Sequence, residues 1–261
     1  MWPEPLLSLW GWSINLYVIM LALGALAALE LGLYQGWERG FSPFLCLAYW
    51  LAGLGGFALG GGILPELIQG IQPGQGRWSP PWVYSILIAE LLLVASRRSW
   101  RTRAPVMMDI VSPAVALGQA IGKLGCFAAG CCHGFPAPDL PWAVTFAGGL
   151  SAARYPGLPL HPVQLYESLG CFFITVLLLR LRRHPSWQGQ LGWLFLVSYG
   201  LLRFVVEFFR GDSRPMVGLL SLNQVICLGF IAIGGAFLLR SARARAKPAN
   251  QPLAPLARSA D

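Results

Sequence analysis

Three polar side chains recur every four residues in an apolar run in the last third of the chain. They are Tyr199, Arg203 and Glu207, within the sequence YGLLRFVVEFFR. A spacing of four places them on one face of a helix, and Arg210 continues nearly the same face. A guanidinium presents a planar fork of donors that suits phosphate, so the pattern favours an anion site in a polar cavity. The alternative is a structural Arg203–Glu207 pair that fixes two helices together.

A second polar group lies upstream, in the sequence HPVQLYE. Pro162 suits the first turn of a helix, and Gln164 and Glu167, three residues apart, share a face of that helix. His161 stands just before it, where an imidazole can titrate near neutral pH. Taken alone, the segment is more typical of a capping turn than of a site.

A third group is the glycine-rich stretch GQAIGKLGCFAAGCCHG, residues 118–134. Its glycines allow another backbone or a ligand to approach closely, and Lys123 adds a cation at about the depth of Arg203. Two cations on separate helices that face one cavity suggest an anionic headgroup. The spacing of Cys126, Cys131 and Cys132 matches no zinc pattern, so we expect no metal there and favour packing or a disulfide.

The composition indicates which elements must position these residues. Hydrophobic residues make up 56% of the 261 residues and charged residues 11%, against about 25% charged residues in soluble domains. This excludes a soluble enzyme, a nucleic-acid-binding module and a disordered chain. We predict an all-α, polytopic membrane protein with about seven transmembrane helices. The expected spans are 12–35, 43–68, 81–97, 105–125, 164–181, 189–210 and 217–240.

The positive charges predict the orientation. A cytoplasmic C-terminus places 13 of the 19 lysines and arginines on the inner side, in agreement with the positive-inside rule. We therefore expect an N-out, C-in protein with a single transmembrane domain over residues 1–240. This domain includes an outer-face loop region at about 126–163, and a flexible cytoplasmic tail follows at 241–261.

The three polar segments, in this order and spacing, resemble the prolipoprotein diacylglyceryl transferase family of the bacterial inner membrane. The resemblance runs from about Tyr17 to about Gln224, and Asp109 has the expected spacing to the glycine-rich stretch. It implies transfer of the diacylglyceryl group of phosphatidylglycerol to the lipobox cysteine of a preprolipoprotein. A thioether forms, glycerol-1-phosphate leaves, and no cofactor is expected. The partners are then phosphatidylglycerol, the lipobox segment and membrane lipid, without nucleic acid.

The motif matches also assign roles to residues. Catalytic roles go to His161, Tyr199, Arg203 and Glu207. Binding of the phosphatidylglycerol headgroup goes to Tyr17, Lys123, Gln164, Glu167 and Arg203.

Departures from the family pattern keep alternatives open. Lys123 stands where the family usually has Arg, and Cys126 where it usually has Asn. Residues 78–84 lack the usual His-Gly-Gly or Tyr-Gly-Gly turn, so we expect His161 to act as the base, with its pKa raised by a nearby carboxylate. A membrane enzyme of the same fold acting on another phospholipid or acceptor is one alternative, and a transporter is a less favoured one.

Overall fold

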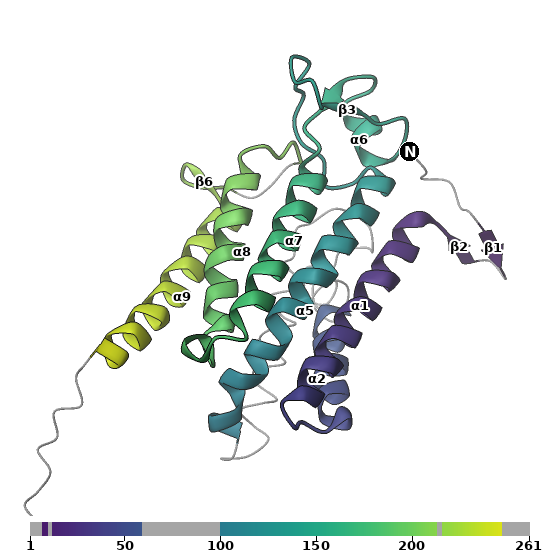
Figure 1. Cartoon of the computed structure of the whole chain (residues 1–261). Helices are drawn as coiled ribbons and strands as arrows, with labels where there is room; N and C mark the ends of the chain where they lie inside the picture. Colours follow the sequence, from purple (N-terminus) through teal and green to yellow (C-terminus); the bar gives the residue numbers. More distant parts are fainter. Residues whose placement is uncertain (1–6, 10–11, 59–99, 213–215, 247–261) are drawn as a thin grey trace, which may run out of the picture.

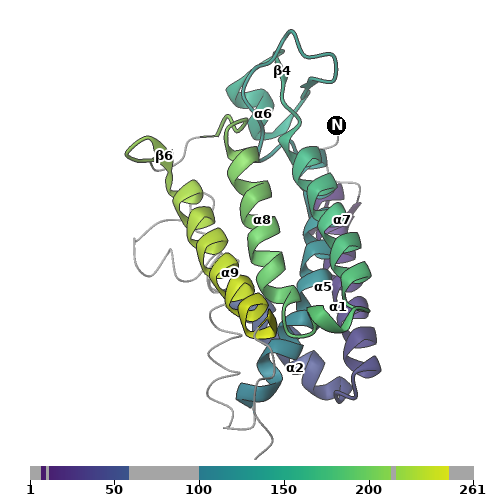
Figure 2. The ribbon, with the colours of Figure 1, turned by 60° about the vertical axis from the view of Figure 1, so that its left-hand side comes forward.

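The bundle is built from long helices. The structure is a computed structural model that describes residues 7–9, 12–58, 100–212 and 216–246. The long helices are α1 (Leu16–Glu38), α2 (Pro43–Ala58), α5 (Trp100–Ala129), α7 (Val163–Leu181), α8 (Leu191–Glu207) and α9 (Leu222–Ala246). They lie side by side, and α5, α7, α8 and α9 alternate in direction along the bundle (Figures 1 and 2).

Short elements accompany this bundle. The segment 130–162 covers one end of α5 and α7 (Figure 1). The elements of this segment are α6 (Gly149–Arg154) and the antiparallel pair β3 (Val144–Thr145) and β4 (Pro159–Leu160). The other short elements are the pair β1 (Leu7–Leu9) and β2 (Trp12–Ile14), the pair β5 (Met216–Val217) and β6 (Leu220–Ser221), and a 3-10 turn at Pro185–Trp187. The predicted helical class is therefore confirmed for the bundle, and the small hairpins were not predicted.

Four of the described helices are long and apolar enough to cross a membrane. They are α1, α5 from Pro105 onward, α7, and α9 as far as Arg245. Helix α8, with 17 residues, is at the lower end of the usual length of a span. The span expected at 81–97 lies outside the described residues, so the full count of seven stays a prediction.

The last predicted span begins too early. Residues 217–221 belong to the hairpin of β5 and β6, and α9 starts at Leu222. Ser221 Oγ accepts a hydrogen bond from the Gln224 amide at 3.1 Å, and Gln224 Oε1 accepts one from the Ser221 amide at 2.9 Å. This reciprocal pair is a capping box, and the sequence SLNQ carries its signature. Helix α9 then runs to Ala246, so the predicted tail begins as helix.

Glycines bring α1 and α5 together. A Cβ atom on Gly24 would lie 2.8 Å from the carbonyl oxygen of Gly118, and one on Gly125 would lie 3.1 Å from that of Tyr17. Larger residues would push the two helices apart. The expectation that these glycines permit close approach of a second backbone is confirmed, and the contact places Tyr17 beside the end of α5.

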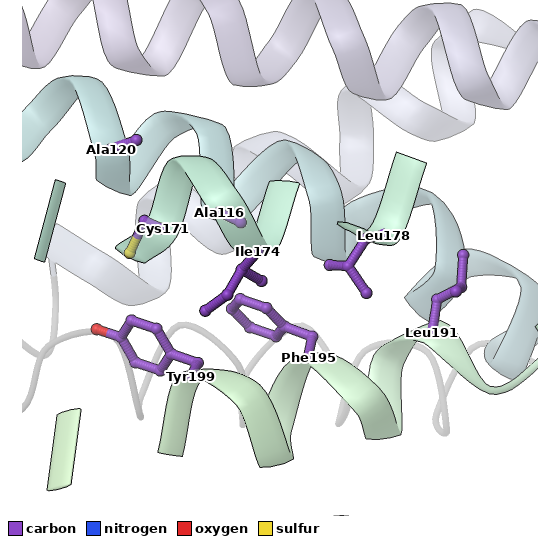
Figure 3. Packing of buried hydrophobic residues seen from close by; sticks show 8 residues of the cluster. All are labelled: Ala116, Ala120, Cys171, Ile174, Leu178, Leu191, Phe195 and Tyr199. Carbon is purple, nitrogen blue, oxygen red and sulfur yellow. The ribbon is translucent and has the colours of Figure 1, made fainter. Parts of the chain in front are cut away.

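One apolar core joins α5, α7 and α8 (Figure 3). Its buried members are Ala116, Ala120, Cys171, Ile174, Leu178, Leu191, Phe195 and Tyr199. Tyr199 is the member at the opposite end of the row from Leu191 (Figure 3), and its ring stacks on Phe195 with 5.5 Å between centroids. Packing therefore fixes Tyr199 one helical turn from Arg203.

Candidate active site

The carboxylate of Glu167, on α7, is the centre of a buried charge cluster. Glu167 is only 1% exposed. Lys123 Nζ, from α5, lies 2.5 Å from its Oε2. Arg203 Nη1, from α8, and Arg210 Nη1 both contact its Oε1, the latter at 2.9 Å. Three cations therefore share one carboxylate, at the end of the bundle that the segment 130–162 covers (Figure 1).

Glu207 forms the second layer of the cluster. Arg203 Nη2 donates to its Oε2 at 3.2 Å. Ser221 Oγ donates to its Oε1 and Asn223 Nδ2 to its Oε2, each at 2.9 Å. The Arg203–Glu207 pair expected from the helix face is present. Both Nη atoms of Arg203 contact carboxylates, and binding of phosphate by this guanidinium stays a prediction.

Arg210 is a member of the cluster that the sequence motif placed near the face but gave no role. It follows the end of α8, and its Nε and Nη2 donate to the two carboxylate oxygens of Asp212, at 2.9 Å each. Its side chain is 3% exposed. The Gly-Asp turn after Arg210 lets one guanidinium contact both Asp212 and Glu167.

Lys123 is the most accessible of the three cations. Its side chain is 16% exposed, against 7% for Arg203 and 3% for Arg210. The Tyr17 hydroxyl, at the start of α1, interacts electrostatically with Lys123, and the Tyr199 hydroxyl does so with Arg203. A ligand would therefore meet Lys123 before it meets either arginine.

His161 lies in an aromatic environment. Its Nδ1 is 3.3 Å from the Tyr166 hydroxyl, and its ring lies 4.9 Å from that of Phe135 and 5.1 Å from that of Phe209, between centroids. Burial lowers the pKa of His161. The expectation that a carboxylate raises this pKa is wrong, because the carboxylate of Glu167 is held by three cations instead.

Gln164 fixes the loop that follows α5. Its Nε2 donates to the carbonyl oxygen of Cys131 at 2.6 Å, and its side chain is fully buried. Its Oε1 has no hydrogen-bond partner among the described residues. A contact between Gln164 and a lipid headgroup stays a prediction.

Three thiols border the cluster. The sulfur atoms of Cys126, Cys131 and Cys132 lie within 4.8 Å of one another, and each cysteine is free. Of the two expectations for these cysteines, packing together is confirmed, and a disulfide is not formed among them. The chain turns back at Gly130 (φ 65°) and Cys132 (φ 54°), which both adopt the left-handed conformation that is uncommon for residues other than glycine.

Together, the fold and the cluster define a helical membrane protein with a buried site of three cations and three carboxylates. Residues 78–84, where the sequence lacks the family's turn, lie outside the described residues.

Comparisons with known proteins agree with this class. The family model for prolipoprotein diacylglyceryl transferase matches residues 84–240. The phosphatidylglycerol–prolipoprotein diacylglyceryl transferase of Clostridium tetani is 34% identical over 244 residues, which cover 88% of this chain and 94% of that protein. Clostridium perfringens has an enzyme of the same name, numbered 2, that is 32% identical over 247 residues. These residues cover 88% of this chain and 92% of that enzyme. The enzyme of this name from Geobacter sulfurreducens is 28% identical over 236 residues, which cover 85% of this chain and 78% of that enzyme. This chain belongs to the prolipoprotein diacylglyceryl transferase family.

Proposed function

We propose that this protein transfers the diacylglyceryl group of phosphatidylglycerol to the lipobox cysteine of a preprolipoprotein. Relatives that span most of the chain carry the name of that activity. The observation that carries the proposal is the convergence of Lys123, Arg203 and Arg210 on Glu167. Cations held in a buried site can stabilise the charge that develops on a departing phosphate.

The reaction is a displacement at a glyceryl carbon. The sulfur of the acceptor forms a C–S bond while the C–O bond to phosphate breaks, and the electron pair of that bond leaves with glycerol-1-phosphate. A neutral thiol is a poor nucleophile, so its proton must be removed, and it ends on the released phosphate. The site must therefore accept a proton and hold negative charge on the leaving group.

The cations supply the second requirement. Lys123 and Arg203 share Glu167, so a phosphate that arrives between them meets both charges. Glu207, itself held by Ser221 and Asn223, keeps Arg203 in one rotamer. Tyr199 orients the headgroup, and Tyr17, Gln164 and Glu167 complete its binding site.

The first requirement is a group that accepts the proton of the thiol. The sequence assigns this role to His161. Burial keeps His161 neutral, as a base must be. Its described contacts, however, are with Tyr166, Phe135 and Phe209 and not with the cluster. The aromatic surroundings favour a packing role for His161.

We also propose the finer topology that the sequence predicts. The chain crosses the bacterial inner membrane seven times, N-out and C-in, with the region 126–163 on the outer face. The four long apolar helices and the distribution of arginines support it. The lipobox segment of the acceptor then reaches the charge cluster from the outer face.

A transfer assay tests the proposal. The purified protein in vesicles is given phosphatidylglycerol labelled in its acyl chains and a peptide that contains a lipobox cysteine. We expect a thioether-linked product and none with a Cys→Ser peptide. Transfer from another phospholipid but not from phosphatidylglycerol would favour the alternative enzyme. Complementation of a strain depleted of the transferase provides the test in cells.

A further inference from the structure

The three thiols at the end of α5 are reactive groups that the proposed function leaves unused. The sulfur atoms of Cys126, Cys131 and Cys132 all lie within 4.8 Å of one another. Each thiol is free, and each cysteine is only partly buried. Three soft donor atoms therefore lie together at a place that solvent reaches.

The way in which α5 ends brings Cys131 back to Cys126. Gly130 adopts a left-handed conformation, with φ 65°. Its amide donates to the carbonyl of Phe127 at 3.2 Å, and the Cys131 amide donates to the carbonyl of Cys126 at 3.1 Å. These two hydrogen bonds form a Schellman motif, the common way in which a glycine ends a helix. The thiol of Cys131 contacts the same Cys126 carbonyl, at 3.6 Å, so the motif sets the two side chains beside each other.

A second left-handed residue adds the third sulfur. Cys132 has a φ of 54°, which is uncommon for a residue with a side chain and persists only where the surrounding structure imposes it. Side chains of adjacent residues in extended backbone point to opposite sides, but this turn places all three sulfurs together. The expectation of no metal rested on the sequence spacing, which does not contain this turn.

The loop that carries Cys131 and Cys132 is fixed to the start of α7. Gln164 Nε2 donates to the Cys131 carbonyl at 2.6 Å, and the Gly134 amide donates to the carbonyl of His161 at 3.2 Å. Hydrogen bonds outside a metal site orient its ligands and are needed for full affinity. The loop therefore holds its two thiols against the thiol of α5 before any ion binds.

The donor set and its dimensions suit zinc. Thiolate sulfur binds Zn²⁺ at about 2.3 Å, so three sulfurs around one ion lie roughly 3.8–4.0 Å apart, and the three thiols need to close by no more than about 1 Å. Thiolates select Zn²⁺, Cu⁺ or iron–sulfur clusters. Of these, Zn²⁺ has no redox chemistry, which suits the outer face proposed for this loop. Water fills the fourth position of the tetrahedron.

We propose that Cys126, Cys131 and Cys132 bind one Zn²⁺ ion, which fixes the loop after α5 to the end of that helix. Three S–Zn bonds form, and the three thiol protons pass to water, so the step needs no oxidant or reductant. The inference goes beyond the proposed function and does not depend on it. Lys123 lies one helical turn before Cys126, so the ion and the charge cluster share the same end of α5.

The first test measures metal in the unmodified protein. The full chain, without a histidine tag, is reduced in nanodiscs, given Zn²⁺ and desalted, and its zinc content is measured by mass spectrometry. We expect about one ion per chain, with three sulfur neighbours at about 2.3 Å in the X-ray absorption spectrum. The absence of retained zinc, or zinc without sulfur neighbours, overturns the proposal.

The second test identifies the ligands. Cys132→Ser should weaken zinc binding by at least the roughly 10–100-fold that loss of an outer hydrogen bond causes, and Gln164→Ala should weaken it by about ten-fold. The variant with all three cysteines changed to serine should retain no zinc. Cys46→Ser, at a buried cysteine of α2, is the matched control and should bind zinc like the wild type. Undiminished zinc in the triple variant overturns the proposal.

The third test uses the wild type alone, so it does not depend on how a variant folds. With free Zn²⁺ at ten times its Kd, about one-tenth of the protein is unbound, so iodoacetamide should modify all three cysteines about ten-fold more slowly. A chelator should restore the rate, and zinc should raise the unfolding temperature. A disulfide between two of the three thiols that prevents zinc binding overturns the proposal. Zinc binding without lipid transfer would refute the proposed function alone, and transfer without zinc binding would refute this inference alone.

Discussion

Two carboxylates in this protein are equally buried but are neutralised in different ways. Asp109 of α5 and Glu167 of α7 are each 1% exposed. Asp109 accepts hydrogen bonds from the backbone amides of Gly189 at 2.5 Å and Leu191 at 2.8 Å, at the start of α8. Glu167 contacts three side-chain cations instead.

We propose that this difference separates a structural carboxylate, Asp109, from a functional one, Glu167. Backbone amides at a helix start cannot move away, so Asp109 fixes α8 against α5 permanently. The cations around Glu167 are side chains, and under the proposed function they would exchange a carboxylate for a phosphate. Other contacts at the end of the bundle that holds Asp109 also join helices to each other. Gln35 donates to the Ile110 carbonyl, and Arg182 pairs with Glu38.

The largest expected effect is on transfer by Arg203→Ala. This change removes the cation that joins Glu167 to Glu207, and we expect the rate to fall by about 10³-fold, the upper end for loss of one stabilising donor. Arg203→Lys should retain little activity, because a point charge does not replace the planar fork. Rates are measured per folded molecule, because removal of one partner of a buried ion pair also destabilises the folded protein by about 3–5 kcal/mol. Near wild-type transfer by Arg203→Ala would remove Arg203 from the phosphate site.

Substitution of Lys123 should have the next largest effect on the transfer rate, and it tests the most exposed cation of the cluster. Lys123→Ala should lower transfer by about 10²-fold, since one cation near the leaving phosphate is lost. Lys123→Arg should be tolerated or more active, because the charge stays and bidentate contact with phosphate becomes possible. The reverse order of the two variants in the labelled-lipid assay would show that this position does not contact phosphate.

Asp109→Ala should lower the stability of the protein and leave the transfer rate per folded molecule nearly unchanged, in contrast to the Arg203 and Lys123 variants. Loss of a helix-capping carboxylate costs about 0.5–2 kcal/mol, and buried amides left without acceptors add to this. We expect a lower unfolding temperature in detergent, with transfer per folded molecule within about two-fold of wild type, well short of the loss of a catalytic group. A large loss of transfer at full stability would end the distinction between the two carboxylates.

The comparison also explains what the sequence could predict. The spacing of Arg203 and Glu207 on one helix face predicted their contact, because a helix has a fixed period. The convergence of Lys123 and Arg203 on Glu167 depends on how three helices are rotated about their axes, which no local spacing encodes.

Ser221 and Asn223 were missed for a different reason. Hydropathy extended the last span over the hairpin of β5 and β6, so these polar residues were counted as part of a span. The capping-box signature SLNQ was the available signal. It would have placed the start of α9 at Leu222 and brought both side chains to the end of α8.

The smallest expected effect concerns His161 and is seen in the pH dependence of stability. Burial lowers the pKa of His161 in the folded protein, while the unfolded chain keeps a value near about 6.5. Between those two values the unfolded state binds more protons, so stability rises with pH and is lost as pH falls below about 6.5. The unfolding temperature of the wild type should therefore drop more between pH 7.5 and 5.5 than that of His161→Gln, which cannot titrate. Transfer by His161→Gln should stay within a few-fold of wild type at pH 8, since its ring contacts Phe135 and Phe209. A loss of about 10²-fold or more would return the role of base to His161 and place it with Glu167 on the functional side of the comparison.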